Sequence, residues 1–408
     1  MSAPVERRDR TQLRGRHSVV TDSQDRTAAE GAGAPSALPG AEGGAPRRGG
    51  VAPPEPKPRG GRGRSAVGLL FLVLSVVLVL ATLASAMIGQ LFIPPGEVVG
   101  SFFRGLGLSF SWLPAPGQEF GHEALWEVRF PRVAMTILVG AALAIAGALM
   151  QGIFGNPLAE PGVVGVSSGA AVGASFSILF GFTFLGSFTT PLFAFLAGLA
   201  TTALVYGLAR AHGRTEVVTL ILTGVAVNAV AGAAISFIVF KAPTSAREQI
   251  VFWQMGSFNG SRWEQVSVIL PIIIAGIAAS LFLARQLDLL ALGEKSARHL
   301  GVNVERLRML AMIYVALLVS AAVAFAGIIA FVGLVVPHLV RMLIGPGHRA
   351  LLPASVLGGA VLLVIADLGA RTLVEFADLP IGMLTSLVGG PFFFYLLRRS
   401  RAASGGWA

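Results

Sequence analysis

A polar segment, residues 286–308, interrupts an otherwise apolar sequence and carries residue types suited to the recognition of another protein. Its centre, residues 290–302, mixes charged residues with small and apolar ones. The small and apolar positions fall at the spacing of one helix face: Gly293, Ala297, Leu300 and Gly301. This pattern predicts a short amphipathic helix that packs into a groove of a cytoplasmic partner. The alternative is an ordinary connector between two membrane spans.

Two short motifs that resemble catalytic sites do not meet their chemical requirements. His122 and the glutamate after it begin like a zinc-protease helix, but Trp126 stands where the second histidine is needed. Lys295 and the serine after it resemble the end of a phosphate-binding loop, but Glu294 replaces a required glycine. The absence of cysteine excludes thiol catalysis, disulfides and Cys-ligated metal. We therefore expect no catalytic residue, no metal site and no cofactor, and the chain cannot hydrolyse ATP by itself.

The elements that position these residues are predicted to be membrane-spanning helices. Hydrophobic residues make up 54% of the chain and charged residues only 13%, against about 25% charged in soluble proteins. Apolar runs of spanning or near-spanning length, for about 30 Å of hydrocarbon, recur ten times: residues 66–88, 133–154, 163–180, 191–209, 217–240, 266–284, 309–326, 327–344, 351–368 and 381–397. We therefore expect an all-α, polytopic membrane protein of about ten transmembrane helices, within residues 65–401.

The charge distribution predicts how these spans are oriented. Residues 1–64 are rich in Arg, Pro, Gly and Ser and carry 12 basic and 7 acidic residues, half of the chain's net charge of +10. Such a leader cannot bury enough apolar surface to fold, so we expect it to be disordered and cytoplasmic. It could bind RNA or anionic lipid, but without interleaved aromatic residues we favour membrane orientation over nucleic-acid binding. Ten spans put the tail, residues 402–408, on the same side of the plasma membrane, in agreement with the positive-inside rule.

Three arginines break this charge rule because the predicted topology puts them on the outside: Arg129, Arg132 and Arg371. Cations at the mouths of helices attract an acidic partner and set its orientation and association rate. Contact with the phosphates of lipid headgroups is the alternative, and the sequence leaves both hypotheses open.

Irregular backbone follows the second predicted span. Residues 155–162 contain two prolines, two glycines and polar groups at the predicted cytoplasmic edge. Such backbone survives at membrane depth only where protein buries it or where it lines a cavity. This run is therefore a candidate gate.

Together these pieces resemble the integral-membrane permease family of ABC importers for ferric siderophores, heme and vitamin B12. The resemblance covers about residues 66–401 and rests on short segments in a fixed order. They are Arg129-Phe-Pro-Arg132 and residues 155–169, 253–260, 292–301, 331–341, 379–382 and 390–393.

The resemblance implies a vitamin B12 permease-like fold and a homodimer, or a pair with a paralogous permease. It also implies two cytoplasmic ABC ATPase subunits and an extracytoplasmic substrate-binding protein. By position, the family's ATPase-coupling helix matches Leu292, Gly293, Glu294, Ala297, Arg298, Leu300 and Gly301. The three arginines match residues that meet glutamates of the binding protein, and Asn156 and Leu158 match a cytoplasmic gate. Val217 and Val218 stand where the similar vitamin B12 permease has a hydroxyl-bearing second gate, which leaves the chemistry of that gate open.

We therefore expect the permease subunit of an ATP-driven importer for an iron chelate, either a ferric siderophore or heme, with ATP hydrolysed by a separate subunit. A cobalamin importer is the alternative within the family. An ion-coupled secondary transporter is a rival outside it, but Glu160 and Asp367 are the main carboxylate candidates near the spans, fewer than a proton relay needs. A membrane scaffold whose basic leader recruits partners is the second rival.

Overall fold

The computed structural model describes residues 62–211, 214–374 and 377–403. Within these residues the chain is helical apart from loops and one hairpin of two-residue strands, β1 (Arg210–Ala211) and β2 (Arg214–Thr215). The all-α prediction is confirmed. The predictions for the leader up to residue 61 and for the tail from residue 404 lie outside the described residues.

Seven helical segments are long and apolar enough to cross a membrane. They correspond to α1 (Arg62–Met87), α4 (Phe130–Phe154), α6 (Thr189–Leu208), α7 (Val217–Lys241), α9 (Trp263–Phe282), α12 (Val304–Ala326) and α14 (His348–Thr372). The shorter apolar helices lie in α5 (Val166–Leu179), α13 (Val332–Ile344) and α15 (Ile381–Ala403). Each predicted span overlaps one of these helices, while the number of membrane crossings stays a prediction.

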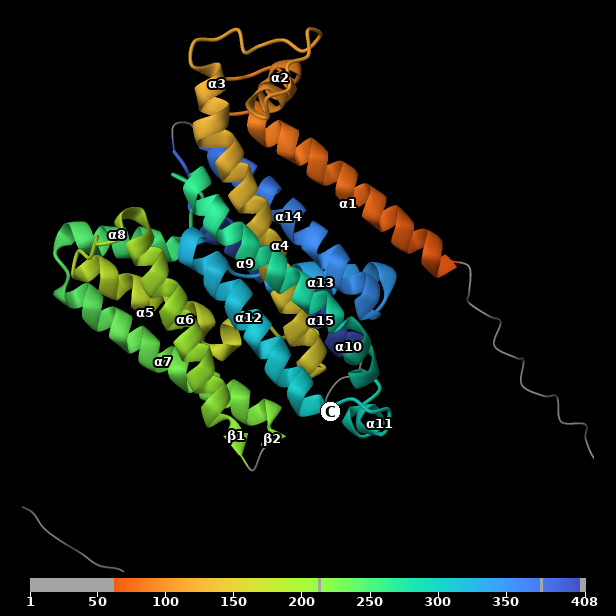
Figure 1. The fold of residues 1–408 in the computed structure, drawn as a ribbon. Helices are drawn as coiled ribbons and strands as arrows, with labels where there is room; N and C mark the ends of the chain where they lie inside the picture. The colour runs from red at the N-terminus through yellow and green to blue at the C-terminus, as the bar shows by residue number, and fades with distance from the viewer. Residues whose placement is uncertain (1–61, 212–213, 375–376, 404–408) are drawn as a thin grey trace, which may run out of the picture. The chain divides into compact units, whose positions relative to one another are not determined.

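The remaining helical elements are short and lie between these helices. They are α2 (Pro95–Gly105), α3 (Gly121–Glu123), η1 (Ala124–Arg129), η2 (Pro161–Val164), η3 (Gly186–Phe188), α8 (Thr244–Met255), α10 (Ala284–Leu290) and α11 (Glu294–His299). In Figure 1, α2 and α3 lie at the top, and α11 lies at the bottom with the β1–β2 hairpin. We call these the α2 end and the α11 end of the bundle.

Helix α4 forms the centre of the bundle. In its most apolar stretch 89% of the residues are buried, against 6% for α1, which lies at the margin (Figure 1). The sequence of α4 is apolar on all sides, which is typical of a helix surrounded by protein. It packs against α9, α12, α13 and α14.

Helices α4 and α14 approach each other through glycine. A Cβ atom on Gly140 would collide with the carbonyl oxygen of Gly359, and one on Gly359 with the carbonyl oxygen of Gly140. Gly147 meets the backbone of Gly333 on α13 in the same way. Small residues permit this backbone approach between membrane helices, where van der Waals packing is a main source of association energy. The centre of the bundle is therefore tightly packed across three helices.

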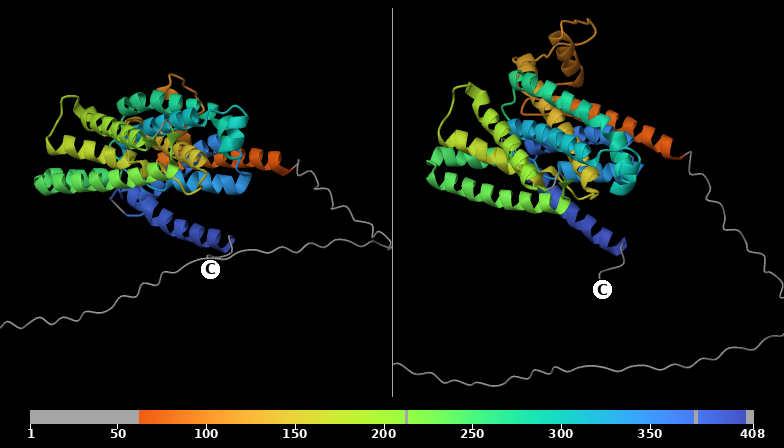
Figure 2. Two further views of the ribbon diagram at one scale, coloured as in Figure 1. Left: turned by 90° about the horizontal axis from the view of Figure 1, so that it is seen from below. Right: turned by 60° about the horizontal axis from the view of Figure 1, so that its bottom comes forward.

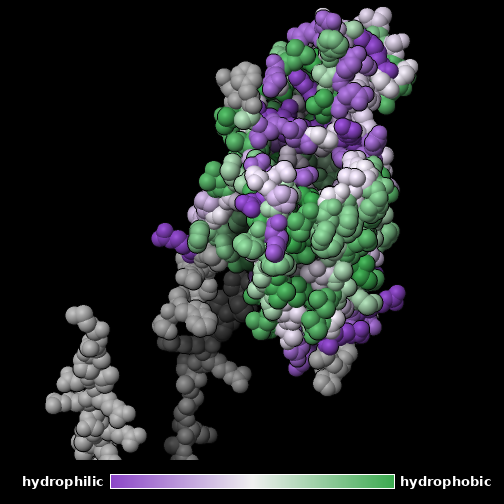
Figure 3. Space-filling view, turned by 90° about the vertical axis from the view of Figure 1, so that its left-hand side faces the viewer, coloured by the Kyte–Doolittle hydropathy of each residue, from purple (hydrophilic) through white to green (hydrophobic). Residues whose placement is uncertain are grey.

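The surface has the polarity expected of a membrane protein. Hydrophobic residues cover the middle of the face in Figure 3, and hydrophilic residues gather toward its two ends. Large apolar side chains remain exposed on α7 and on α15, such as Val230 at 70% and Val388 at 65%. Helix α15 lies at one margin of the bundle (Figure 2). These exposed faces are available to lipid or to another subunit.

The eighth predicted span starts later in the structure than in the prediction. The span predicted from residue 327 begins as a helix only at Val332, because Gly327 and Phe331 have φ angles of 70° and 68°. These values lie in the left-handed region, which interrupts a right-handed helix. Hydropathy cannot reveal this break, since residues 327–331 are as apolar as the helices on either side.

The close packing of α4 and α14 predicts that even one added methyl group is destabilising. Gly359→Ala should lower the free energy of unfolding by about 1–3 kcal/mol, the usual cost of overpacking. Gly232→Ala on α7, where no atom lies within 4 Å of the added Cβ, is the matched control. It should leave stability unchanged or raise it, because alanine favours helix by about 1 kcal/mol over glycine. Thermal unfolding in detergent, followed by tryptophan fluorescence, measures the difference, and equal midpoints would contradict the packing argument.

Candidate functional site

The predicted docking segment forms a short helix, α11, between two glycines in a left-handed conformation. Gly293 has a φ of 101° and Gly301 a φ of 85°, and a Cβ atom at either position would meet open space. Glycine is favoured at both positions because other residues rarely adopt these φ angles. The two glycines therefore set the direction of α11, and neither packs against this chain at its Cβ position.

Helix α11 is buried on one side and exposed on the other. Ala297 is fully buried in the core of its own chain, whereas Leu292 and Leu300 are 65% and 57% exposed. The prediction that Ala297 and Leu300 share an outward face is wrong, because Ala297 anchors the helix to the bundle. The large apolar side chains that the segment around α11 exposes are these two leucines. An exposed pair of leucines flanked by charged residues is suited to a protein contact.

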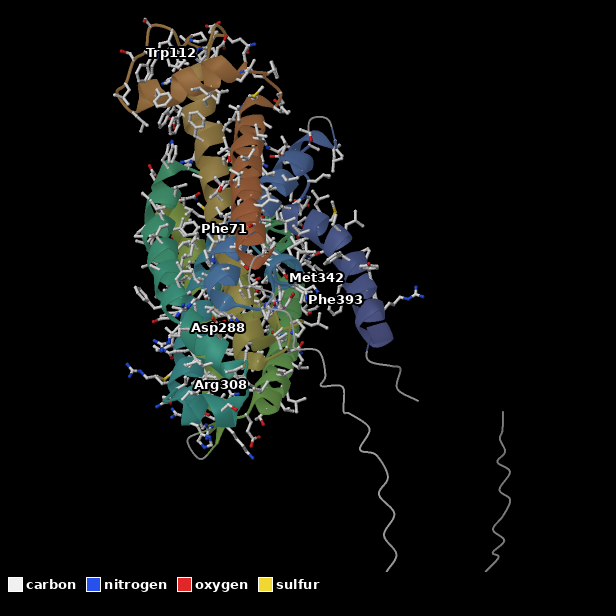
Figure 4. The ribbon with its side chains drawn as sticks, turned by 90° about the vertical axis from the view of Figure 1, so that its right-hand side faces the viewer. Phe71, Trp112, Asp288, Arg308, Met342 and Phe393 are labelled. Carbon is white, nitrogen blue, oxygen red and sulfur yellow. The ribbon has the colours of Figure 1, made fainter. Side chains whose placement is uncertain are left out.

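Charged side chains fix both ends of the segment that carries α11. Glu294 accepts a hydrogen bond from Arg308 of α12 and lies 3.6 Å from Arg298, one helical turn away. On α10, Asp288 accepts hydrogen bonds from the backbone nitrogen and from Nδ1 of His348, at 2.6 Å and 2.9 Å. Asp288 therefore caps the first turn of α14. Figure 4 labels Asp288 and Arg308 toward the same end of the molecule, opposite Trp112.

At the α2 end, Arg129 joins α1 to the start of α4. Its guanidinium donates to the carbonyl oxygens of Ala86 and Met87, at 2.6 Å and 2.9 Å, and to that of Leu91. The first two carbonyls belong to the last turn of α1, where cations are favourable because carbonyl groups lack helical partners. Arg129 ends the π-helical turn η1, which widens the helix two residues before Pro131. The guanidinium of Arg129 is therefore hydrogen-bonded to the end of a helix of its own chain.

Arg132 and Arg371 form a charge network with two aspartates. Nε of Arg132 donates to Asp367 at 3.0 Å, and Nη1 donates to Asp378 at 2.9 Å. Nε of Arg371 lies 3.4 Å from Asp367, and Nη2 donates to the hydroxyl of Ser85 on α1 at 2.7 Å. Asp367 is only 1% exposed, and a buried carboxylate is tolerated when it is paired. The network joins α1, α4 and α14.

The three arginines are therefore not open at the surface of this structure. Arg129 and Arg132 are each 7% exposed, and the side chain of Arg371 is 10% exposed. The sequence does hold one indication of this pairing, because Asp367 precedes Arg371 by four residues, the spacing of a helical ion pair. Whether these arginines meet a binding protein stays a prediction.

The candidate gate, residues 155–162, is held by local and tertiary hydrogen bonds. Asn156 Oδ1 accepts from the backbone nitrogen of Leu158 at 2.9 Å, which makes a tight turn. Asn228 of α7, which sequence reasoning missed, donates to the carbonyl oxygen of Gly162 at 3.2 Å. Glu160 lines a cavity of about 110 Å³. Residues 160–162 line this cavity and are tied to α7, whereas Asn156 is exposed and Leu158 is half-buried outside the lining.

The second gate position lies at the start of α7. Val217 is half-buried and Val218 is 69% exposed. Neither side chain can form hydrogen bonds. Any gating role of this turn would therefore depend on packing and on the position of α7.

A known family shares this helical arrangement. The family described as the FecCD transport family matches residues 77–399, which is most of the chain. The chain belongs to the FecCD transport family. The resemblance to ABC importer permeases is thus confirmed.

Relatives of this FecCD permease include transporters of two different cargoes. The hemin transport system permease protein HmuU of Yersinia pestis is 40% identical over 84% of this chain and 99% of its own length. The cobalamin import system permease protein BtuC of Halobacterium salinarum is 39% identical over 82% of this chain and 95% of its own length. Sequence identity therefore does not separate the two cargoes.

A solved structure has the same fold as this FecCD permease. It is described as an inward-facing conformation of a metal-chelate type ABC transporter and has a TM-score of 0.70 and 35% sequence identity. The match covers 81% of this chain and 99% of that chain. The architecture described above is therefore that of an ABC importer permease.

The charge network at the α2 end predicts unequal roles for its two aspartates. Asp367→Asn should lower the free energy of unfolding by roughly 3–5 kcal/mol, because two largely buried guanidiniums lose their shared charge. Asp378→Asn is the matched control. The side chain of Asp378 is 32% exposed and forms an ion pair with Arg132 but not with Arg371. It should cost about 1 kcal/mol or less. Thermal unfolding of the two purified variants tests this, and equal destabilisation would refute a central role for Asp367.

Proposed function

We propose that this FecCD permease is the translocation subunit of an ATP-driven importer for an iron chelate, heme or a ferric siderophore. The observation that carries the proposal is α11, a short helix fixed at a polar end of the bundle with Leu292 and Leu300 exposed. The hemin relative and the solved metal-chelate type transporter support an iron chelate as cargo. Cobalamin is the alternative cargo, supported by a relative at nearly the same identity.

In this proposal α11 sits in a cleft of a cytoplasmic ABC ATPase, with two ATPase subunits in the complete transporter. Leu292 and Leu300 fill the apolar part of the cleft, while Lys295 and Arg298 on the exposed surface contact its rim. Glu294 stays bound to Arg308 and orients the helix. The ATPase subunits hydrolyse ATP, and this chain provides the path and no covalent chemistry.

The complete transporter also needs a second permease and a binding protein. A second copy of this chain, or a paralogous permease, would cover the exposed apolar faces of α7 and α15. A substrate-binding protein docks at the α2 end, outside the plasma membrane, with both termini of this chain in the cytoplasm. Its acidic residues would compete with Asp367 and Asp378 for the arginines, which supports a link between docking and the positions of α1, α4 and α14.

Transport in this scheme depends on two orientations of the permease pair. ATP must favour one orientation over the other, because a ligand that binds both states equally shifts no equilibrium. Helix α11 passes the ATPase movement to α10 and α12, between which it lies in the chain. The cytoplasmic gate at Asn156 and Leu158 then opens or closes as α7 changes position, since Asn228 of α7 holds that run.

The docking role of α11 predicts the effect of charging its exposed face. Leu292→Asp combined with Leu300→Asp should abolish ATP-dependent uptake and binding of the ATPase, because two charges would enter an apolar cleft. Folding should be retained, since both side chains are already largely exposed. Leu106→Asp, at a position 57% exposed near the α2 end, is the matched control and should bind the ATPase normally. ATPase binding by the double variant equal to that of the control would contradict the docking role.

The cargo is tested by uptake into vesicles that contain the permease, its ATPase and its binding protein. Ferric siderophore, hemin and cobalamin are offered separately, with and without ATP. We expect ATP-dependent accumulation of an iron chelate and none of cobalamin. Accumulation of cobalamin alone would replace the proposed cargo with the alternative, and uptake driven by a proton gradient without ATP would refute the importer.

A further inference from the structure

Arg308 on α12 is a buried cation that joins separate segments of the α11 end. Arg308 is only 6% exposed, and its Nη2 donates to the carboxylate of Glu294, the first residue of α11. Nη1 donates to the carbonyl oxygen of Thr215 in the β1–β2 hairpin at 3.3 Å and lies 3.7 Å from Glu305. Figure 4 labels Arg308 at this end of the bundle. One guanidinium therefore contacts both the coupling helix and the hairpin.

The hairpin is also bound to α12 through a second contact. The backbone nitrogen of Thr215 donates to Glu305 at 3.0 Å, and its hydroxyl donates to the hydroxyl of Tyr206 at 3.3 Å. Thr215 is 5% exposed and lies two residues before the first residue of α7, Val217. A continuous set of contacts thus runs from Glu294 through Arg308 to the segment that leads into α7.

We propose that Arg308 is a positioning residue that holds α11 and the β1–β2 hairpin together as one unit. Displacement of α11 would then move the first turn of α7 directly, without first deforming the whole length of α12. The consequence for transport rests on the proposed function, whereas the link itself is a property of this chain. The residue acts through α11 and α7 and contacts no cargo.

The geometry of the side chain explains why arginine is needed. A guanidinium is a rigid planar fork with five N–H donors, so it can bind partners on two sides at fixed angles. A lysine ammonium is a compact charge on a flexible stem and would lose the fixed geometry. Because both carry one positive charge, Arg308→Lys keeps the electrostatic balance with Glu294 and Glu305 while it removes the fork. If this variant loses the link between α11 and the hairpin, then Arg308 acts by positioning its partners and not simply by neutralising their charge.

The link is tested by a distance measurement in the full chain, which contains no native cysteine. Spin labels are attached at Ser296→Cys on α11 and Glu216→Cys beside the hairpin, two exposed positions. Pulsed electron paramagnetic resonance in lipid nanodiscs, without nucleotide or ATPase, gives the distribution of distances between the labels. We expect one narrow distribution in the parent protein and loss of that narrow distribution in Arg308→Lys.

Two further variants keep the test decisive. Glu294→Gln removes the charge of the exposed carboxylate and so weakens its hydrogen bond to Arg308 without altering the buried arginine. It should also broaden the distribution even if Arg308→Lys folds poorly. Arg306→Met removes an exposed arginine two residues from Arg308 and should leave the narrow distribution intact. A narrow distribution in both Arg308→Lys and Glu294→Gln would overturn the proposal.

Uptake measurements then show whether the link serves transport. In vesicles with the ATPase, Arg308→Lys should reduce ATP-dependent uptake by roughly 2- to 30-fold, the range found for residues that couple distant sites. ATPase binding should be unchanged, because Leu292 and Leu300 are untouched. Undiminished uptake would overturn the coupling role of Arg308. Failure of the parent protein to transport any chelate would refute the proposed function and leave the distance result standing.

Discussion

The arrangement of this permease depends on the cost of burying charge inside a membrane bundle. A buried ion that loses its partner is strongly destabilising, so each buried charge fixes the position of the groups around it. At the α2 end, Asp367 holds Arg132 and Arg371, and Arg371 in turn donates to Ser85, so that α14, α4 and α1 are joined. At the α11 end, Arg308 holds Glu294 and the hairpin before α7. Between these ends, α4 and α14 meet through glycines and have little freedom to separate.

Helix α14 connects the two ends of the bundle. Helix α14 extends from His348, whose backbone nitrogen is bound by Asp288 of α10, to the buried Asp367 near the opposite end. A tightly packed helix transmits displacement better than a loosely packed one, because interiors at crystal-like density deform little. The chain therefore combines a packed centre with specific ionic contacts where ATPase and binding protein are proposed to act.

Much of the fold could be predicted because hydropathy follows burial in the membrane. The run predicted as 217–240 agrees closely with α7 (Val217–Lys241). Helix α12 begins at Val304, where Asn303 caps it, whereas the predicted span began at residue 309 because Glu305, Arg306 and Arg308 interrupt the apolar run. Short segments in a fixed order predicted the family correctly. The count of ten crossings depends on the shorter apolar helices, and hydropathy does not show whether these helices cross the membrane.

The candidate site was less predictable because its contacts are distant in sequence. Arg132 and Asp367 are 235 residues apart and Arg308 and Thr215 are 93 apart, so neither pairing is visible in local patterns.

The proposed function depends on contact between the exposed face of α11 and an ATPase. A photo-crosslinking amino acid placed at Leu300 in the assembled transporter probes this contact. We expect a crosslink to the ATPase subunit. Crosslinks confined to this chain's own helices during active transport would refute the contact.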